Sequence, residues 1–312
     1  MPVPALDCWF LTGPTASGKS GVGVELARLI DAEIVSLDSM ALYRGMDVGT
    51  AKPGIEERGG VPHHLIDVIE PHEEYSLARY LEAAHACIED IQARGKQVLF
   101  VGGTPLYLKG LLRGIFEGPP ADWDFRNRLR QEAEQHGPGW LHGRLAAVDP
   151  ASAERLHPND TRRLIRALEV YEKTGRPISE LQKQFGVGRP ANECRVFVLN
   201  WPRRDLHARI NRRVDEMFEG GLIDEVAGLL ARAKPLSRTT AMAVGYWEVI
   251  EHLNGERPLP ETIEAVKSHT RQLAKRQHTW FRGLSECRFI PVPGRIDDKQ
   301  YAERIAGLLS EG

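Results

Sequence analysis

The chain has 312 residues, of which 27 % are charged and 42 % are hydrophobic, as is typical of soluble globular proteins. A net charge of −2 excludes a protein that is basic over its whole surface, although local basic patches remain compatible with it. The four cysteines lie far apart and lack the spacing of a zinc site or a disulfide framework. Neither a signal peptide nor a membrane span is indicated, so we expect a cytoplasmic protein that does not enter the membrane.

The first third of the chain alternates short strands with helices. An apolar run at 8–11 that stops at Gly13 predicts a buried strand. The helical spacing of Val22, Leu26, Leu29 and Ile30 predicts the helix that follows. Further strands are expected at 33–37 and 98–101, with an amphipathic helix at 75–93 between them. This order predicts an α/β fold with a parallel sheet covered by helices.

The middle of the chain differs in pattern. After the Gly-Pro-Pro at 118–120, residues 122–184 have helical patterns and no strand. A strand at 195–199, long helices at 205–233 and 261–283 and a last strand at 288–291 complete the chain. We therefore expect an α/β core formed by 1–116 and 195–312, interrupted by a helical insertion at 117–194.

A phosphate-binding loop follows the first strand. The residues fit G-x-x-x-x-G-K-[ST], with a strand before and a helix after, as the motif requires. Backbone N–H groups of such a loop point at phosphate oxygens, Lys19 neutralises them, and Ser20 is the expected Mg²⁺ ligand. The pattern indicates a polyphosphate ligand without specifying ATP. The predicted binding residues are Gly13, Pro14, Thr15, Ala16, Ser17, Gly18, Lys19 and Ser20.

The acidic residue expected beside such a loop is in an unusual place. P-loop proteins that hydrolyse ATP carry a Mg²⁺-binding Asp at the end of another core strand, but the strand at 98–101 runs into Gly102-Gly103-Thr104. Asp38 instead follows the second strand. Because the carboxyl ends of parallel strands face the ligand crevice, we expect Asp38 near the phosphate loop. From position alone, a general base and a helix N-cap fit Asp38 equally well.

Six segments together resemble the bacterial tRNA dimethylallyltransferase family. They keep their order over nearly the whole chain, and the minor departures are Pro105 and Trp247. The segments are GPTASGKS at 13–20, DSMALYRGMDVGTAKP at 38–53, HHLIDVIEP at 63–71, VGGTPLYLKGLL at 101–112, HPNDTRRLIRALEVY at 157–171 and VGYWEVI at 244–250.

This resemblance implies a P-loop NTPase-like core and a specific reaction. Dimethylallyl diphosphate would donate its prenyl group to the exocyclic amine of the adenosine 3′-adjacent to the tRNA anticodon, with Mg²⁺ as cofactor and diphosphate released. It assigns Asp38 as the base that takes the amine proton, and makes Lys19 and Thr104 catalytic. Thr104 would contact the target nucleotide, although a helix cap is the alternative for this residue.

Basic residues at helical spacing are candidates for contacts with the anticodon stem-loop. Arg162, Arg163 and Arg166 lie opposite an apolar stripe, and Arg271 and Lys275 share a face of the last long helix. Solvated charged faces are the general alternative; the resemblance favours Arg126 and 162–166. The predicted tRNA-binding residues are Asp38, Ser39, Met40, Ala41, Thr104, Arg126, Arg162, Arg163, Leu164, Ile165, Arg166, Arg271 and Lys275.

Two further features have a structural and a functional interpretation. Arg209 and Arg213 lie one helical turn apart and either clamp the diphosphate or pair with Asp205, Asp215 or Glu216. The pair His63-His64 lacks the spacing of a helical metal site, and we interpret it as structural. Nothing in the sequence indicates an obligate dimer, so we expect a monomer.

Three other functions fit parts of the pattern. A nucleotide kinase using ATP would share the loop and the helical insertion. A non-catalytic RNA-binding P-loop module would bind tRNA without forming a product. A prenyltransferase acting on free adenine nucleotides would not need an extended cationic surface.

Overall fold

The computed structural model of the protein describes residues 5–116, 118–182 and 188–308. The chain divides into two units, a core made of 1–112 and 188–312 and an inserted unit at 113–187. The expected insertion, 117–194, overlaps this second unit but begins and ends later along the chain.

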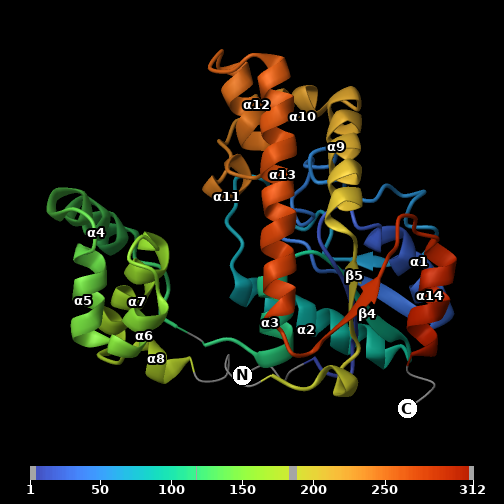
Figure 1. Ribbon diagram of the computed structural model, residues 1–312, viewed down its shortest axis with the longest axis horizontal. Coiled ribbons are helices and arrows are strands. Elements are labelled where there is room, and N and C mark those ends of the chain that lie inside the picture. The colour runs from blue at the N-terminus through green and yellow to red at the C-terminus, as the bar shows by residue number, and fades with distance from the viewer. Residues whose placement is uncertain (1–4, 117, 183–187, 309–312) are drawn as a thin grey trace. The chain divides into compact units, whose positions relative to one another are not determined.

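The core is built on a six-stranded parallel sheet (Figure 1). The strand order β3-β2-β4-β1-β5-β6 places the strand that precedes the phosphate loop in the interior of the sheet. The expected parallel α/β core is therefore confirmed. The strands are β1 (Trp9–Thr12), β2 (Ala32–Ser36), β3 (His63–His64), β4 (Gln97–Gly102), β5 (Val196–Asn200) and β6 (Cys287–Pro291).

Strand β1 is a short, completely buried run, because helices cover both faces of a parallel sheet. It pairs with β4 on one side and β5 on the other. Phe10 stacks on Phe100 of β4 with ring centres 5.0 Å apart, while Trp9 packs near Phe197 of β5. These contacts fix the place from which the phosphate loop emerges.

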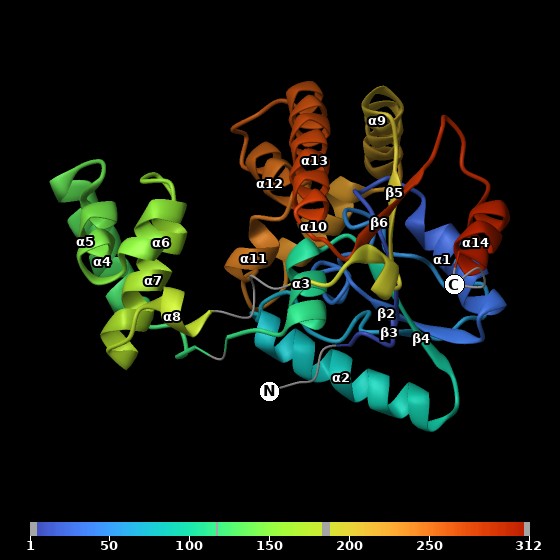
Figure 2. The same ribbon diagram turned by 60° about the horizontal axis from the view of Figure 1, so that its bottom comes forward.

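Helices pack in pairs around this sheet (Figures 1 and 2). Helices α1 and α14 lie side by side, α2 packs on β2 and β4, and the long helices α9 and α13 run beside each other. No described helix is long and apolar enough to cross a membrane. The core helices are α1 (Lys19–Leu29), α2 (Leu77–Ala93), α3 (Pro105–Arg113), η2 (Ala191–Glu193), α9 (Arg203–Glu219), α10 (Leu222–Leu230), α11 (Arg238–Ala241), α12 (Tyr246–Leu253), α13 (Leu259–Arg282) and α14 (Asp298–Gly307).

One expectation about the core elements was wrong. The long helix predicted at 205–233 is two helices, since α9 ends at Glu219 and α10 begins after Gly221, whose φ is +92°. This left-handed conformation suits glycine and breaks a helix.

The inserted unit contains helices and no strand among its described residues, and it has its own apolar core. Its helices are α4 (Trp123–His136), α5 (Trp140–Val148), α6 (Pro150–Arg155), α7 (Thr161–Thr174) and α8 (Ile178–Leu181). Leu164 and Leu168 of α7 are buried together with Leu145 of α5. A buried apolar cluster of this kind stabilises the inserted unit through its own hydrophobic core.

Candidate active site

Parallel pairing brings the predicted site residues to one edge of the sheet. The phosphate loop follows β1, Thr104 follows β4 and Asp38 follows β2. Since the order is β2-β4-β1, Thr104 lies between the other two. This is the crevice in which doubly wound sheets bind their ligands.

The phosphate loop takes a conformation that frees the first turn of α1. Ala16 and Gly18 both have positive φ values, +63° and +86°. Gly18 is the N-cap of α1, and no side chain bonds to the first N–H groups of the helix. These N–H groups carry partial positive charge and are available to an anion.

Side chains from after β5 brace the outside of the loop. The indole Nε1 of Trp201 donates to the carbonyl of Ser17 over 2.9 Å, and Nε of Arg209 donates to the carbonyl of Ala16 over 2.8 Å. The Arg209 guanidinium also stacks over the Trp201 ring, 4.6 Å from its centre. Because these carbonyls are held outward, the loop keeps its N–H groups turned toward the ligand.

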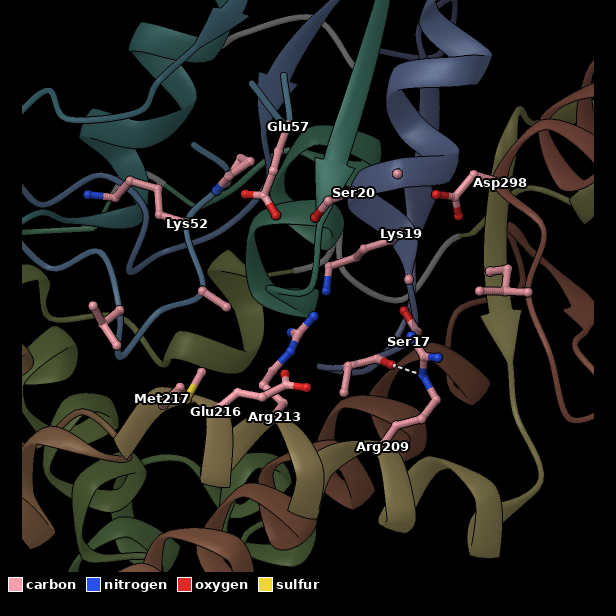
Figure 3. Close-up of a pocket in the computed structure, with 17 residues that line it drawn as sticks. Ser17, Lys19, Ser20, Lys52, Glu57, Arg209, Arg213, Glu216, Met217 and Asp298 are labelled. Atoms are coloured by element: carbon pink, nitrogen blue, oxygen red, sulfur yellow. Dashed lines mark hydrogen bonds between the residues drawn. The ribbon is translucent and has the colours of Figure 1, made fainter. Parts of the chain in front are cut away.

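A pocket of about 660 Å³ opens at the loop (Figure 3). In the close-up, Lys19 and Arg213 extend toward each other from opposite walls. The lining combines the predicted loop with parts of the chain that sequence analysis did not assign to the site. The lining residues are Ala16, Ser17, Gly18, Lys19, Ser20, Gly21, Val48, Ala51, Lys52, Pro53, Glu57, Arg209, Arg213, Glu216, Met217, Ile296 and Asp298.

Two cations in this pocket lack an ion-pair partner, although Asp38 lies near Lys19, and Glu216 and Glu57 lie near Arg213. Burial lowers the pKa of Lys19 to about 8, an effect that nearby Asp38 opposes and Arg213 reinforces. Burial also lowers the pKa of Arg213, and nearby Arg209 adds to that effect. No carboxylate lies within ion-pair distance of Lys19 or Arg213 among the described residues. The pocket is therefore prepared for an anion.

The ion pairs considered as the alternative for α9 do not involve its pocket arginines. Asp205 pairs with Arg204, and Asp215 pairs with Lys267. Arg209 braces the loop, whereas the side chain of Arg213 extends into the pocket.

The first three residues of the predicted phosphate motif do not line the pocket. Pro14 has no N–H, and the N–H of Thr15 donates to the side chain of Gln277 over 2.9 Å. A Cβ on Gly13 would approach the Ser17 hydroxyl to 2.9 Å. Gly13, Pro14 and Thr15 therefore shape the loop, and the anion-facing part is the segment from Ala16 to Ser20.

Asp38 and Thr104 belong to one hydrogen-bonded arrangement. Thr104 Oγ1 accepts the N–H of Ser39 over 3.0 Å, and the N–H of Thr104 donates to the carbonyl of Leu37. Asp38 Oδ1 accepts the N–H of Met40 over 2.8 Å, while Oδ2 has no hydrogen-bond partner in the described chain. No helix follows Asp38, so it is not a helix cap. One carboxylate oxygen fixes the turn and the other is available.

The segment 38–41 is only partly accessible. Asp38, Ser39 and Met40 are half-buried, but the side chain of Ala41 is 6 % exposed. Ala41 was predicted as a tRNA contact, and its side chain instead belongs to the core.

A loop at 47–53 forms another wall of the pocket. Three consecutive N–H groups, of Asp47, Val48 and Gly49, donate to the carboxylate of Glu225, which also accepts the Tyr246 hydroxyl over 2.6 Å. Lys52 is held by carboxylates of Asp47 and Asp67. Two of the quoted sequence segments, 38–53 and 244–250, thus meet through Glu225.

In the inserted unit, two of the arginines predicted to bind RNA form hydrogen bonds with a buried carboxylate. Arg126 forms two hydrogen bonds with Glu169, at 2.8 and 2.7 Å, and Arg166 donates to the same group. Glu169 is completely buried. Burial alone would raise its pKa, but the bonds from Arg126, the Asp122 N–H and Arg166 lower the pKa overall.

Other predicted contacts on α7 divide into exposed and buried residues. Arg162 and Arg163 are exposed, whereas Leu164 and Ile165 are 0 % and 2 % exposed in the insertion core. The side chains of Leu164 and Ile165 cannot contact RNA in this arrangement, because they hold α7 in its own unit.

The basic face predicted on α13 is also divided. Arg271 donates to Asn211 of α9 over 2.6 Å, and His278 lies 3.1 Å from the Asn200 side chain. Lys275 is exposed, and its ammonium has no partner among the described residues. Lys275 therefore remains the accessible cation of the two predicted here.

The His63-His64 pair has a structural role. It forms the edge strand β3, and His64 Nε2 lies 2.6 Å from Glu33, which also binds Arg94. Within the described ranges, no group of three or more His, Cys, Asp or Glu side chains could hold a metal ion.

Comparison with known proteins identifies the family. The model of a family described as IPP transferase matches residues 41–284. The chain belongs to the IPP transferase family. A tRNA dimethylallyltransferase of Rhodopirellula baltica is 51 % identical, over 90 % of this chain and 87 % of the relative.

Solved structures of IPP transferases support the same assignment. A tRNA isopentenylpyrophosphate transferase from Bacillus halodurans is 38 % identical, with a TM-score of 0.70 over 98 % of this chain and 97 % of its own. A eukaryotic dimethylallyltransferase acting on tRNA is 29 % identical, with a TM-score of 0.72 over 91 % of this chain and 73 % of its own. The predicted family resemblance and P-loop-type core are confirmed.

Several residues of this site were not predicted from the sequence. Gln277 was given no role, and the one available signal is a polar residue among the buried positions of α13. Lys52 lies within a segment quoted for the family resemblance, but its spacing gave no role. Ile296 and Asp298 line the pocket from the segment after β6, and no local sequence pattern predicts this position.

Proposed function

We propose that this enzyme transfers the dimethylallyl group of dimethylallyl diphosphate to the exocyclic amine of the adenosine 3′-adjacent to the anticodon of tRNA. The names of its relatives and of its eukaryotic structural neighbour support a prenyl transfer to tRNA. The observation that carries the proposal is the anion pocket, with its unpaired cations, close to a carboxylate that has a free oxygen. No described feature favours an ATP-dependent kinase, because β4 ends without an acidic residue.

The diphosphate would occupy the mouth of the phosphate loop. The N–H groups at the start of α1, the Lys19 ammonium and the Arg213 guanidinium are its proposed donors. Negative charge grows on the diphosphate as it leaves, so these groups stabilise the transition state more than the bound substrate.

A magnesium ion fits this pocket as a companion of the diphosphate. Mg²⁺ prefers oxygen ligands and keeps several waters, using one or two protein groups together with phosphate oxygens. Ser20 and Glu57 line the pocket and can supply such oxygens. When bound, the ion would neutralise charge on the leaving diphosphate.

The transfer needs a base on the side of the nucleotide. The exocyclic nitrogen of adenine is a weak nucleophile, because its lone pair is delocalised into the ring. As the new carbon–nitrogen bond forms and the carbon–oxygen bond to diphosphate breaks, Asp38 Oδ2 would accept the nitrogen-bound proton. Thr104 would keep the Asp38 turn in place through Ser39 and contact the nucleotide from the neighbouring strand.

The accessible basic residues are the proposed contacts with the anticodon stem-loop. These are Arg162 and Arg163 in the inserted unit and Lys275 on α13, together with the turn at 38–40. Their contacts with phosphates would help to offset the cost of extracting a stacked base, on the order of a few kcal/mol. Since nothing in the sequence indicates an obligate dimer, we propose a monomer, acting in the cytoplasm.

The decisive experiment incubates the protein with dimethylallyl diphosphate labelled in the prenyl group and unmodified tRNA, with and without Mg²⁺. Prenyl label on the adenosine 3′ of the anticodon, with one diphosphate released per label, is the expected result. Label on free adenine nucleotides instead of tRNA, or phosphate released from ATP, would contradict the proposal.

A further inference from the structure

The side chain of Gln277 joins two catalytic loops that the sheet leaves separate. Gln277 lies on α13 and is 9 % exposed. Its Oε1 accepts the N–H of Thr15, in the phosphate loop, over 2.9 Å. Its Nε2 donates to the carbonyl of Gly103, in the loop after β4, over 2.7 Å. Since one partner is a donor and the other an acceptor, the amide orientation is determined by chemistry.

The approach of Gln277 is close and leaves no space for a larger residue at Gly103. A Cβ at that position would stand 2.8 Å from Gln277 Nε2 and 3.5 Å from the Lys19 ammonium. The amide bridge therefore lies next to the cation that faces the anion pocket.

The bridge continues toward the proposed base. Thr104, the residue after Gly103, accepts the N–H of Ser39 and donates its own N–H to Leu37. Asp38 stands between those two residues. A displacement of the Gly103 loop would thus move the Asp38 turn relative to the phosphate loop.

We propose that Gln277 is a positioning residue. Through its bonds to Thr15 and Gly103, it sets the distance between the phosphate loop, which holds the leaving diphosphate, and the Asp38 turn. This inference rests on the proposed prenyl transfer. That reaction joins the prenyl carbon, whose diphosphate is bound by the phosphate loop, to the adenine nitrogen beside Asp38. A misplacement of about 1 Å between reacting groups costs about 100-fold in rate. Loss of the bridge therefore lowers kcat and leaves substrate affinity nearly intact.

The test compares Gln277→Leu and Gln277→Glu with the wild type and with Gln272→Leu, an exposed glutamine on the same helix. Expected for Gln277→Leu is a fall in kcat of about 100-fold, with both KM values changed by less than about threefold and a cooperative thermal unfolding transition. Gln272→Leu should match the wild type.

The Gln277→Glu variant gives a signature that lost stability does not imitate, and it carries the test if Gln277→Leu does not fold. An ionised carboxylate repels the Gly103 carbonyl, but a protonated one accepts from Thr15 and donates to Gly103 as glutamine does. The ratio of its kcat to that of the wild type should rise as pH falls.

A ratio that does not change with pH, an unchanged kcat, or an effect confined to KM would overturn the inference. If the wild type forms product, these results contradict only the role of Gln277. If the wild type forms no product, the proposed function and the role of Gln277 are both contradicted.

Discussion

Arginines and lysines that the sequence assigns to anion binding have opposite surroundings in the two units of the molecule. In the pocket, Lys19 and Arg213 face no carboxylate within ion-pair distance among the described residues. In the inserted unit, Arg126 and Arg166 share the buried carboxylate of Glu169. Spacing and charge in the sequence look alike, but only the folded chain reveals which cations already have a partner.

The difference has an energetic meaning. A buried cation without a counter-charge destabilises the free protein and becomes favourable when an anion arrives. A cation that shares a buried carboxylate holds the unit together, and removing one partner leaves the other uncompensated. The first kind of residue serves binding at some cost to stability, and the second serves the fold.

Removing Lys19 should have the largest effect on activity among these cations. We expect Lys19→Met to lower kcat/KM for dimethylallyl diphosphate by about 1000-fold, since it removes charge stabilisation of the leaving group. The same change should not lower the melting temperature, because a half-buried cation without an ion-pair partner is lost. Steady-state kinetics and thermal unfolding check both halves, with the exposed Lys299→Met as control. A loss below tenfold would show that Lys19 does not face the diphosphate.

Removing Glu169 should affect stability instead of the chemical step. Glu169→Gln is expected to lower the free energy of unfolding of the inserted unit by about 3 kcal/mol, the lower end for a buried pair because both arginines are partly exposed. The exposed Glu172→Gln on the same helix should change it by less than about 0.5 kcal/mol. Denaturant unfolding followed by helical signal measures this. Equal stability of the two variants would remove the distinction drawn between the units.

The pH dependence should identify Lys19 as the cation of the pocket. Burial depresses its pKa from 10.5 to about 8, so the cost of burying its charge is present below pH 8 and disappears as the pH rises toward 10.5. The free wild-type protein should gain stability over that interval relative to Lys19→Met. Affinity for the diphosphate should instead decrease as the pH rises. We expect kcat/KM to fall up to about tenfold per pH unit above 8, because Lys19 loses its charge. A wild-type profile that parallels that of Lys19→Met would contradict this assignment.

The smallest effects are expected at the exposed arginines of α7. Arg162→Ala and Arg163→Ala should each raise KM for tRNA a few-fold, without changing kcat, and each should reduce the slope of log affinity against log salt by about one. Titration of tRNA binding at several salt concentrations measures the slope. An unchanged slope in the double variant would assign these arginines to a solvated face.

The parts of the fold that local patterns specify were predictable from the sequence. Strand β1 and the helix that begins at Lys19 follow from an apolar run, a glycine-rich turn and helical spacing. The break at Gly220-Gly221 was missed, because the apolar spacing continues across it. The two-residue strand β3 is too short for any periodicity and forms only because β2 offers an edge.

The candidate site divides in the same way. The loop at 13–20 and Asp38 could be predicted because each directly follows a recognisable strand. Gln277 joins Thr15 across 262 positions of the chain, and a bond of that range leaves no local pattern. The burial of Leu164 and Ile165 was visible in their spacing, but the family resemblance gave the whole segment one role. Only the packing separates its exposed arginines from the apolar residues that hold the helix.

The central claim is that Asp38 takes the proton of the incoming amine beside an occupied diphosphate pocket, and Asp38→Asn tests it most directly. Asparagine keeps an oxygen for the Met40 N–H but cannot accept a proton at neutral pH. Single-turnover transfer from labelled dimethylallyl diphosphate to tRNA should slow by about 100- to 10,000-fold, while the dissociation constants of both substrates stay within about threefold of wild type. Transfer at the wild-type rate, or a loss explained entirely by weaker tRNA binding, would contradict the claim.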